Sequence, residues 1–275
     1  MAARLGLRLA ALGYLAALLV FPIGLVFWRT FENGIGPVID AATTPEALHA
    51  LWLTVIIAVI VVPANTIFGI VCALVIVRDN FRWKGVLNTV VDLPFALSPV
   101  VIGLSLYLVY ARTGWFGGWL IDHGISVIFA LPGMILATIF VSLPFVVRET
   151  VPVLRELGIE QEEAAWTLGA SPLSTFFRVT LPAIRWGVTY GIVLTTARAI
   201  GELGAVSIVS GSIAGRTETL TLHVQERFNS FDLTGAYTAS VELALLALIT
   251  LFLMTILRRE KSGGDSDSPG DEALR

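Results

Sequence analysis

Two ionisable side chains lie within a long apolar segment. Arg198 and Glu202 are four positions apart, so on a helix they share a face and can form an ion pair. A charge at the centre of a membrane helix costs about 2.5 to 3.5 kcal/mol on insertion scales and usually marks a functional position. One interpretation is a self-neutralising pair that fixes the segment to its neighbours, with help from Asp92 or Glu242. The other is a guanidinium that borders an anion path, because arginine can bind two oxygens of an oxyanion.

The sequence contains no motif for catalysis, metal binding or nucleotide binding. No G-x-x-x-x-G-K-[ST] occurs, and neither Lys84 nor Lys261 follows a glycine-rich loop. There is no G-x-S-x-G and no H-E-x-x-H, and the three histidines lie in separate segments. The single Cys72 excludes an intrachain disulfide and a cysteine-based metal cluster. We therefore expect no catalytic residue, metal or cofactor in this chain, and any ATP would be bound by another polypeptide.

The composition indicates a protein that lies in a lipid bilayer. Apolar residues make up 56% of the chain and charged residues only 14%, far from the average of soluble proteins. The formal net charge of -3, with no stripe of basic residues, excludes a nucleic-acid partner. The bilayer is therefore the environment in which the segments must be interpreted.

Six apolar segments are long enough to cross about 30 Å of hydrocarbon. The first is too long for a signal peptide and has no clear cleavage site, so we interpret it as a retained anchor. In the fifth, Gly187 and Gly191 form a pair typical of close helix approach, although glycine is also generally common in membrane helices. The predicted spans are 8–28, 51–77, 86–110, 127–147, 186–210 and 236–257. The prolines expected to kink them are Pro63, Pro94, Pro99, Pro132 and Pro144.

The basic residues predict the orientation of these spans. With a cytoplasmic N-terminus, only four of the 18 basic side chains face outward, as the positive-inside rule requires. Both termini are then cytoplasmic. The fold class is all-α integral membrane, with six transmembrane helices in one domain over 1–257. The stretch 262–272 has no large apolar residue to bury, so 258–275 is predicted to be a disordered tail. The four outward-facing basic residues are Arg29, Arg112, Arg216 and Arg227.

The longest loop on the cytoplasmic side, about 148–185, is patterned as two short helices with an elbow between them. Acidic residues begin the first helix and Gly169 provides a left-handed stop. Ser171 and Pro172 then form a cap and first turn, and Pro182 is expected to end the second helix. Such a protrusion could dock a soluble partner by placing a helix in a groove, or it could lie on the lipid headgroups.

Seven residues of this loop resemble the EAA loop of ABC importer permeases, with the usual spacing between them. The resemblance implies that the loop sits in a cleft of an ATPase subunit and passes nucleotide-driven closure to the membrane helices. It also implies that the glutamate and the glycine set the bend, that the two alanines allow close approach, and that the valine and leucine hold the second helix against the bundle. The matching residues are Glu163, Ala164, Ala165, Gly169, Val179, Leu181 and Pro182.

Two further segments resemble the permeases of sulfate and thiosulfate importers, namely 92–101 and 197–207. The stretch 209–224 is similar to the W-type subunit of that system. This implies a type I ABC importer permease fold in the bacterial cytoplasmic membrane and a translocation path near Asp92, Ser98, Arg198 and Glu202. The implied partners are ATPase subunits that bind ATP and Mg, a second permease of the T-type, an external sulfate-binding protein and the lipid bilayer.

Three alternatives remain at this stage. Molybdate and phosphate permeases share the EAA loop. A secondary transporter would work without ATP and usually shows an inverted repeat, which these spans lack. A membrane scaffold or receptor would leave the intramembrane charges and the bent loop without a use.

Overall fold

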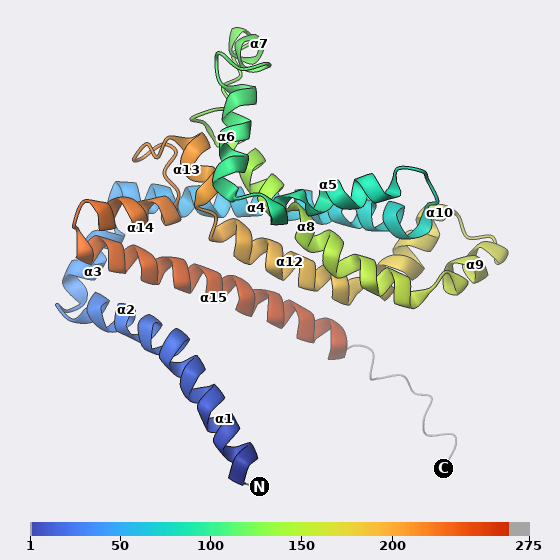
Figure 1. Ribbon diagram of the computed structural model, residues 1–275, viewed down its shortest axis with the longest axis horizontal. Helices are drawn as coiled ribbons and strands as arrows, with labels where there is room; N and C mark the ends of the chain where they lie inside the picture. The colour runs from blue at the N-terminus through green and yellow to red at the C-terminus, as the bar shows by residue number, and fades with distance from the viewer. Residues whose placement is uncertain (1, 264–275) are drawn as a thin grey trace. The chain divides into compact units, whose positions relative to one another are not determined.

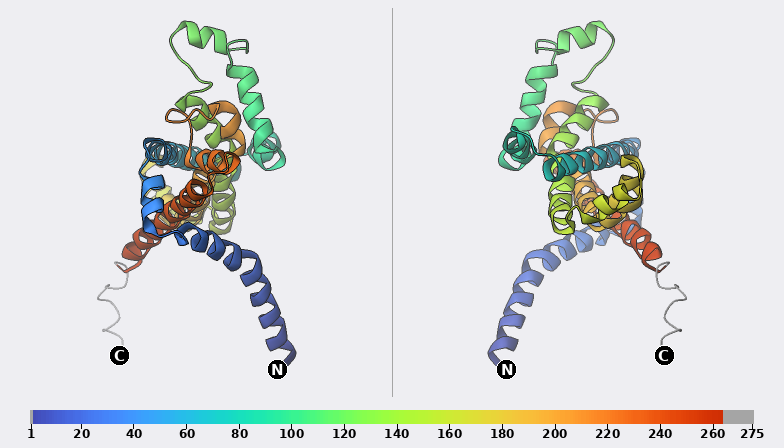
Figure 2. Two further views of the ribbon diagram at one scale, coloured as in Figure 1. Left: turned by 90° about the vertical axis from the view of Figure 1, so that its left-hand side faces the viewer. Right: turned by 90° about the vertical axis from the view of Figure 1, so that its right-hand side faces the viewer.

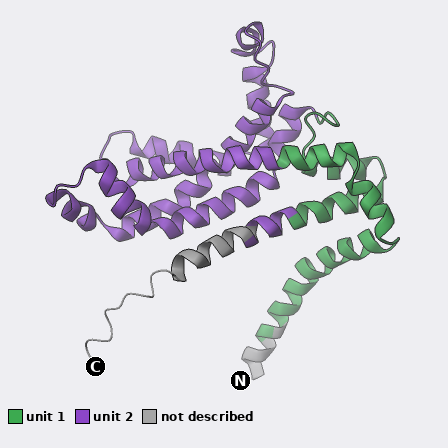
Figure 3. Cartoon of the chain, turned by 180° about the vertical axis from the view of Figure 1, so that it is seen from behind, with its two compact units in different colours: residues 1–54, 212–245 green, residues 55–211, 246–275 purple. Residues whose placement is uncertain are grey.

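The computed structural model describes residues 2–263 and is helical or in connecting turns throughout that range (Figure 1). The chain divides into two units, coloured separately in Figure 3. One comprises residues 1–54 and 212–245, and the other comprises 55–211 and 246–275.

The smaller unit begins with a helical rod of three consecutive elements. They are α1 (Ala2–Leu15), the π-helical η1 (Ala16–Val20) and α2 (Phe21–Phe31). A candidate span runs over Ala10–Phe31, close to the predicted 8–28, and its apolar surface is not buried within the chain. A surface of this kind suits lipid or another membrane subunit.

A short helix, α3 (Ile35–Ala42), leads to the long helix α4 (Pro45–Arg78), which passes from this unit into the other. The hydroxyl of Thr44 accepts a hydrogen bond from the Ala47 N–H at 3.3 Å and so caps the start of α4. The unit also contains α14 (Leu220–Asn229) and the first part of α15 (Leu233–Gly263). The latter continues beyond the predicted span end at 257. The remainder of the predicted tail, 264–275, lies outside the described residues.

The larger unit contains the part of α4 beyond residue 54, the part of α15 beyond residue 245 and ten further elements. These are α5 (Lys84–Ala96), α6 (Pro99–Tyr110), α7 (Gly117–Asp122), α8 (Leu131–Leu157), α9 (Glu160–Thr167), α10 (Pro172–Thr175), η2 (Phe176–Thr180), α11 (Leu181–Ala183), α12 (Arg185–Ile200) and α13 (Gly204–Ser210).

The core of the larger unit lies where α4, α5, α8 and α12 pack together. Helices α8 and α12 run side by side (Figure 1), and glycines allow the close approach. A Cβ on Gly191 of α12 would lie 2.6 Å from the Cα of Val146 in α8. A Cβ on Gly69, which belongs to α4, would lie 2.5 Å from the Cβ of the same valine. A Cβ on Gly187 would lie 2.6 Å from the Glu149 carbonyl oxygen. The small-residue pair predicted in the fifth span thus serves close packing.

The helices differ from the predicted spans in two ways. Within residues 2–263, four helices are long and apolar enough to cross a membrane, and the number reaches six only if two bent pairs each count as one span. These pairs are α5 with α6, bent by 110°, and α12 with α13, bent by 50°. The predicted spans 86–110 and 186–210 are therefore broken, not continuous. Two of the five prolines expected within helices, Pro99 and Pro132, instead lie in first turns.

The fourth predicted span, 127–147, was wrong at both ends. Residues 127–130 are not helical, because Phe129 has a left-handed backbone (φ 59°) and its N–H donates to the Val209 carbonyl. At the other end, α8 continues to Leu157 and stops at Gly158, where φ is 67°. The loop that follows is therefore shorter than the predicted 148–185.

Candidate functional site

The first helix break lies between α5 and α6. Leu97 and Ser98 are extended, with ψ angles of 140° and 138°, and Pro99 then opens α6. Proline lacks an N–H and has a helical φ, so it favours a helix start at this point. Ser98 is exposed, and its carbonyl accepts hydrogen bonds from the N–H groups of Val101 and Ile102. In Figure 1, α6 turns sharply away from α5 at this break.

The second break, between α12 and α13, is held by Glu202. One carboxylate oxygen lies 2.7 Å from Arg198 Nη2, and the other accepts a hydrogen bond from the Ala205 N–H at 2.8 Å. The Glu202 side chain is 1% exposed, whereas that of Arg198 is 31% exposed. The structure thus brings the two charges together and gives the carboxylate a second role as a cap for α13.

The two breaks pack against each other. A Cβ on Gly103 would lie 2.6 Å from the Ala205 carbonyl oxygen, and one on Gly204 would lie 2.9 Å from the Pro99 Cβ. Helices α6 and α13 are in contact, so the segments 92–101 and 197–207 meet in space. Broken helices of this kind are a recurring feature of membrane transport sites.

Asp92 does not join the Arg198 pair, contrary to expectation. Its carboxylate accepts from Arg148 Nε at 2.6 Å and also pairs with Nη2 of the same guanidinium. The cause is the extra length of α8, which carries Arg148 past the predicted end and places it against α5. Both side chains are about 40% exposed, so the pair is a second site where charge is accessible.

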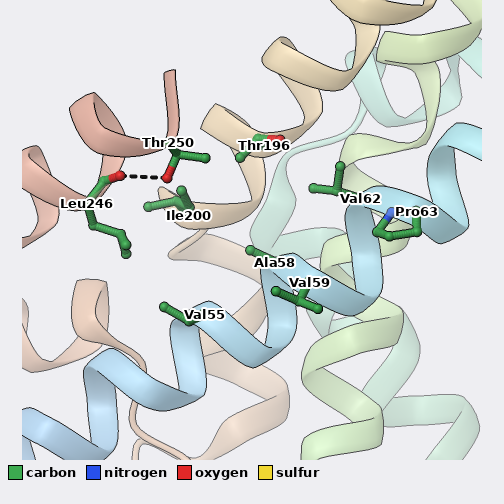
Figure 4. Close-up of a pocket in the computed structure, with 9 residues that line it drawn as sticks. All are labelled: Val55, Ala58, Val59, Val62, Pro63, Thr196, Ile200, Leu246 and Thr250. Carbon is green, nitrogen blue, oxygen red and sulfur yellow. Dashed lines mark hydrogen bonds between the residues drawn. The ribbon is translucent and has the colours of Figure 1, made fainter. Parts of the chain in front are cut away.

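An apolar cavity of about 310 Å³ lies among α4, α12 and α15 within the larger unit (Figure 4). The hydroxyls of Thr196 and Thr250 both donate to carbonyls of their own helices, at 2.7 and 2.6 Å. The wall therefore offers no free donor to an anion, and the cavity is not an anion site. Its lining residues are Val55, Ala58, Val59, Val62, Pro63, Thr196, Ile200, Leu246 and Thr250.

The elbow predicted around Gly169 is present. Gly169 has φ 84°, and its N–H donates to the Trp166 carbonyl at 2.9 Å. The Ala170 N–H donates to the Ala165 carbonyl at 3.0 Å, which completes a Schellman motif. The backbone thus requires glycine, although no neighbour lies within 4 Å of a Cβ added there.

The second helix of the elbow begins as predicted but ends later. The Ser171 hydroxyl accepts a hydrogen bond from the Ser174 N–H at 3.3 Å. Pro182 does not terminate the segment, because it lies in the first turn of α11. The regular pattern ends at the buried Ile184, and α12 starts at the next residue.

A buried charge network that the sequence patterns did not reveal holds the elbow to α4. Glu162 is buried and pairs with Arg78 at 3.0 Å, and it accepts a hydrogen bond from the Thr180 hydroxyl at 2.9 Å. Arg78 also donates to the carbonyl of Gly158 at 2.7 Å. Glu163, which was expected to set the bend, is exposed. A polar run such as α9 gives no periodic signal that distinguishes the buried glutamate from its neighbours.

The outer surface of the elbow is rich in exposed apolar side chains. Leu181 packs against the core of the larger unit, and Val179 is half-buried. The side of the elbow that carries these two residues therefore holds its second helix against the core. Ala164 is exposed and Ala165 is half-buried, so both leave space at the surface. The exposed large side chains are Trp166 (47%), Leu168 (89%), Leu173 (72%) and Phe177 (61%). This surface suits contact with a protein partner.

Comparisons with known proteins agree with these features. The chain is 50% identical to the sulfate transport system permease protein CysW of Synechocystis sp., over 90% of each chain. It is 49% identical to the protein of that name from Escherichia coli K12, over 88% of this chain and 84% of that one. It is 38% identical to the sulfate transport system permease protein CysT of Synechococcus elongatus, over 90% of each chain.

The fold resembles that of a bacterial ABC transporter involved in the import of alginate, with a TM-score of 0.78 over 94% of this chain and 95% of that one. At 15% identity this likeness concerns the fold alone. The family model described as "Binding-protein-dependent transport system inner membrane component" matches residues 65–262. The chain is therefore an all-helical membrane protein that belongs to the binding-protein-dependent transport family, the permeases of ABC importers.

Proposed function

We propose that this chain is the W-type permease subunit of an ATP-driven sulfate importer. Relatives named CysW are 48 to 50% identical to it, whereas the CysT protein of Synechococcus elongatus is 38% identical. The similarity covers about nine tenths of the chain, including both helix breaks. This extended similarity is the observation that carries the proposal.

The proposed anion path passes the paired helix breaks. Arg198 is partly accessible and can offer two donors to oxygens of a tetrahedral anion, and Ser98 adds an exposed hydroxyl next to α6. An isolated guanidinium would hold a dianion too strongly for rapid release. Glu202 weakens that attraction, because its carboxylate lies 2.7 Å from the guanidinium. Thiosulfate, with the same shape and charge, is an expected second solute.

The proposed coupling element is the elbow over 158–184. Its exposed apolar side chains would dock in a cleft of an ATPase subunit, which binds ATP and Mg. Nucleotide-driven closure of that cleft would then move the elbow as one body. The Arg78–Glu162 pair and the packing of Leu181 link this body to α4 and to the core. The chain itself would hydrolyse nothing.

The complete importer would contain further chains. A T-type permease would supply the other half of the membrane pathway, in keeping with the CysT relatives. An external protein would deliver the solute, as the family description "binding-protein-dependent" implies. The predicted orientation places both termini and the elbow on the cytoplasmic side.

Uptake of labelled sulfate in a strain that lacks this chain tests the proposal. We expect the deletion to abolish uptake and the restored chain to recover it, with little competition from molybdate. A strain with an inactive ATPase subunit serves as control and should also fail to take up sulfate. Sulfate uptake that survives deletion, or a recovered activity that prefers molybdate or phosphate, would contradict the proposal.

A further inference from the structure

A polar pocket lies at the α9 end of α12, apart from the paired helix breaks. Its volume is about 470 Å³. Figure 2 (right) looks onto this end of the larger unit. Arginines lie on one part of the wall, and small apolar side chains form another part. The lining residues are Gln161, Arg178, Val179, Pro182, Ala183, Arg185 and Trp186.

The two arginines of this pocket have no acidic partner within the described part of the chain. None of the ion pairs there involves Arg178 or Arg185, and no carboxylate lines the pocket. The nearby Glu162 is already committed to Arg78 and Thr180. Two positive charges thus face one recess without compensation, and such a recess attracts an anion.

The local backbone brings the two arginines to the same recess. Arg178 lies in the π-helical η2, and Arg185 begins α12 directly after the irregular residue Ile184, whose ψ is 2°. π-Helical turns are rare and are frequently found at functional sites. The Arg185 guanidinium also lies over the Trp186 ring, 5.5 Å from its centroid, which restricts its position.

We propose that this pocket binds the phosphate of an anionic phospholipid. Arginine matches phosphate geometry well, and basic pockets at the cytoplasmic ends of membrane helices suit lipid headgroups. Trp186 stands at the start of a membrane helix, where tryptophan marks the headgroup level. Val179, Pro182 and Ala183 would contact the glycerol and upper acyl groups, which free phosphate lacks. This site depends on the membrane placement of α12 and not on the identity of the transported solute.

Binding of phosphatidylglycerol to the delipidated, purified transporter complex tests this proposal. Retention of labelled lipid is measured for the wild type, for R178Q, R185Q and the double variant, and for R155Q. Arg155 is an exposed arginine in the last turn of α8 and does not line the pocket, so it is a matched control. We expect affinity to fall about fivefold for each pocket arginine removed and to stay unchanged for R155Q. Phosphatidylcholine should bind weakly to every variant.

Three results would overturn the proposal. Equal loss in R155Q and R178Q would show that only overall charge matters. Unchanged affinity in the double variant would show that the lipid binds elsewhere. Displacement of the lipid by millimolar inorganic phosphate would assign the pocket to a free anion. Gel filtration of each variant checks that the complex assembles, so a folding defect is distinguished from a loss of lipid binding. The double variant R178K and R185K keeps both positive charges but lacks the planar guanidinium groups, and it reports whether charge alone is sufficient for lipid binding.

Discussion

At the scale of single residues, Glu202 combines two interactions in one buried carboxylate. It pairs with Arg198 and caps α13 through the Ala205 N–H. An exchange of the two charges would therefore not be neutral, because arginine at position 202 has no acceptor for that N–H. Substitutions that keep the acceptor separate the two roles better than a charge swap does.

We predict that Glu202→Gln is milder than Glu202→Ala. Glutamine keeps an acceptor oxygen for the cap, whereas alanine loses both the cap and the partner of Arg198. The additional loss for alanine should be about 1.5 to 3 kcal/mol, the range for hydrogen bonds to charged groups. Thermal unfolding in detergent measures it, and sulfate uptake is recorded in parallel. Equal stability of the two variants would show that the cap contributes nothing.

Glu162 and Glu163 provide a matched pair for the elbow. Glu162→Ala leaves Arg78 without its buried partner and should destabilise the elbow by of order 2 to 3 kcal/mol, whereas Glu163→Ala should have little effect on stability. Hydrogen exchange of the amides over 158–184 distinguishes them. If Glu163→Ala exchanged as fast as Glu162→Ala, the buried network would not be what fixes the elbow.

At the scale of secondary-structure elements, the contact between α8 and α12 depends on the absence of a side chain. Gly191→Ala would place a methyl group 2.6 Å from the Val146 Cα, and backbone cannot yield as a side chain can. We predict a loss of about 1 to 3 kcal/mol in stability, as for other overpacked cores. Gly36→Ala is the control, because no atom lies within 4 Å of its added Cβ. Equal melting temperatures would contradict the close packing.

Sequence patterns predicted helix starts and turns better than helix breaks. Ser171 caps a helix as expected, and Gly169 adopts the left-handed backbone. These features depend on local chemistry. The breaks at 97–98 and 201–203 lie inside apolar runs, where hydropathy gives no boundary, and tertiary packing between α6 and α13 accompanies them.

The charged residues show the same limit. The spacing of Arg198 and Glu202 predicted their pairing, because residues four positions apart lie about one helical turn from each other on the same face. The partners of Asp92 and Glu162 are distant in sequence, at Arg148 and Arg78. Such pairs depend on how helices pack, and one sequence contains no signal for that arrangement.

At the scale of the whole molecule, the orientation in the membrane is a prediction from the basic residues. We predict that a cysteine at Ser174 resists an impermeant thiol reagent applied to intact cells, whereas one at Asp122 reacts. Both are introduced after Cys72→Ala, which removes the native thiol. Asp122 is exposed, and its segment is predicted to face outward. Labelling of the cysteine at position 174 together with protection of the one at position 122 would show that the chain has the opposite orientation and would contradict the prediction.

The central claim is that ATP hydrolysis on a partner drives sulfate through this chain by way of the elbow. Transport of labelled sulfate by the complete complex in proteoliposomes, with the ATPase rate recorded in the same sample, tests it most directly. Gly169→Val should keep assembly but lose most transport, because its φ of 84° is strained for a β-branched residue by about 1 to 2 kcal/mol. Gly85→Val, in a helix with open space around it, is the control. The account predicts ATP-dependent sulfate uptake by the wild type and by Gly85→Val, and ATP hydrolysis without sulfate uptake by Gly169→Val. Sulfate uptake without ATP, or coupling of hydrolysis to uptake in Gly169→Val as in the wild type, would contradict it.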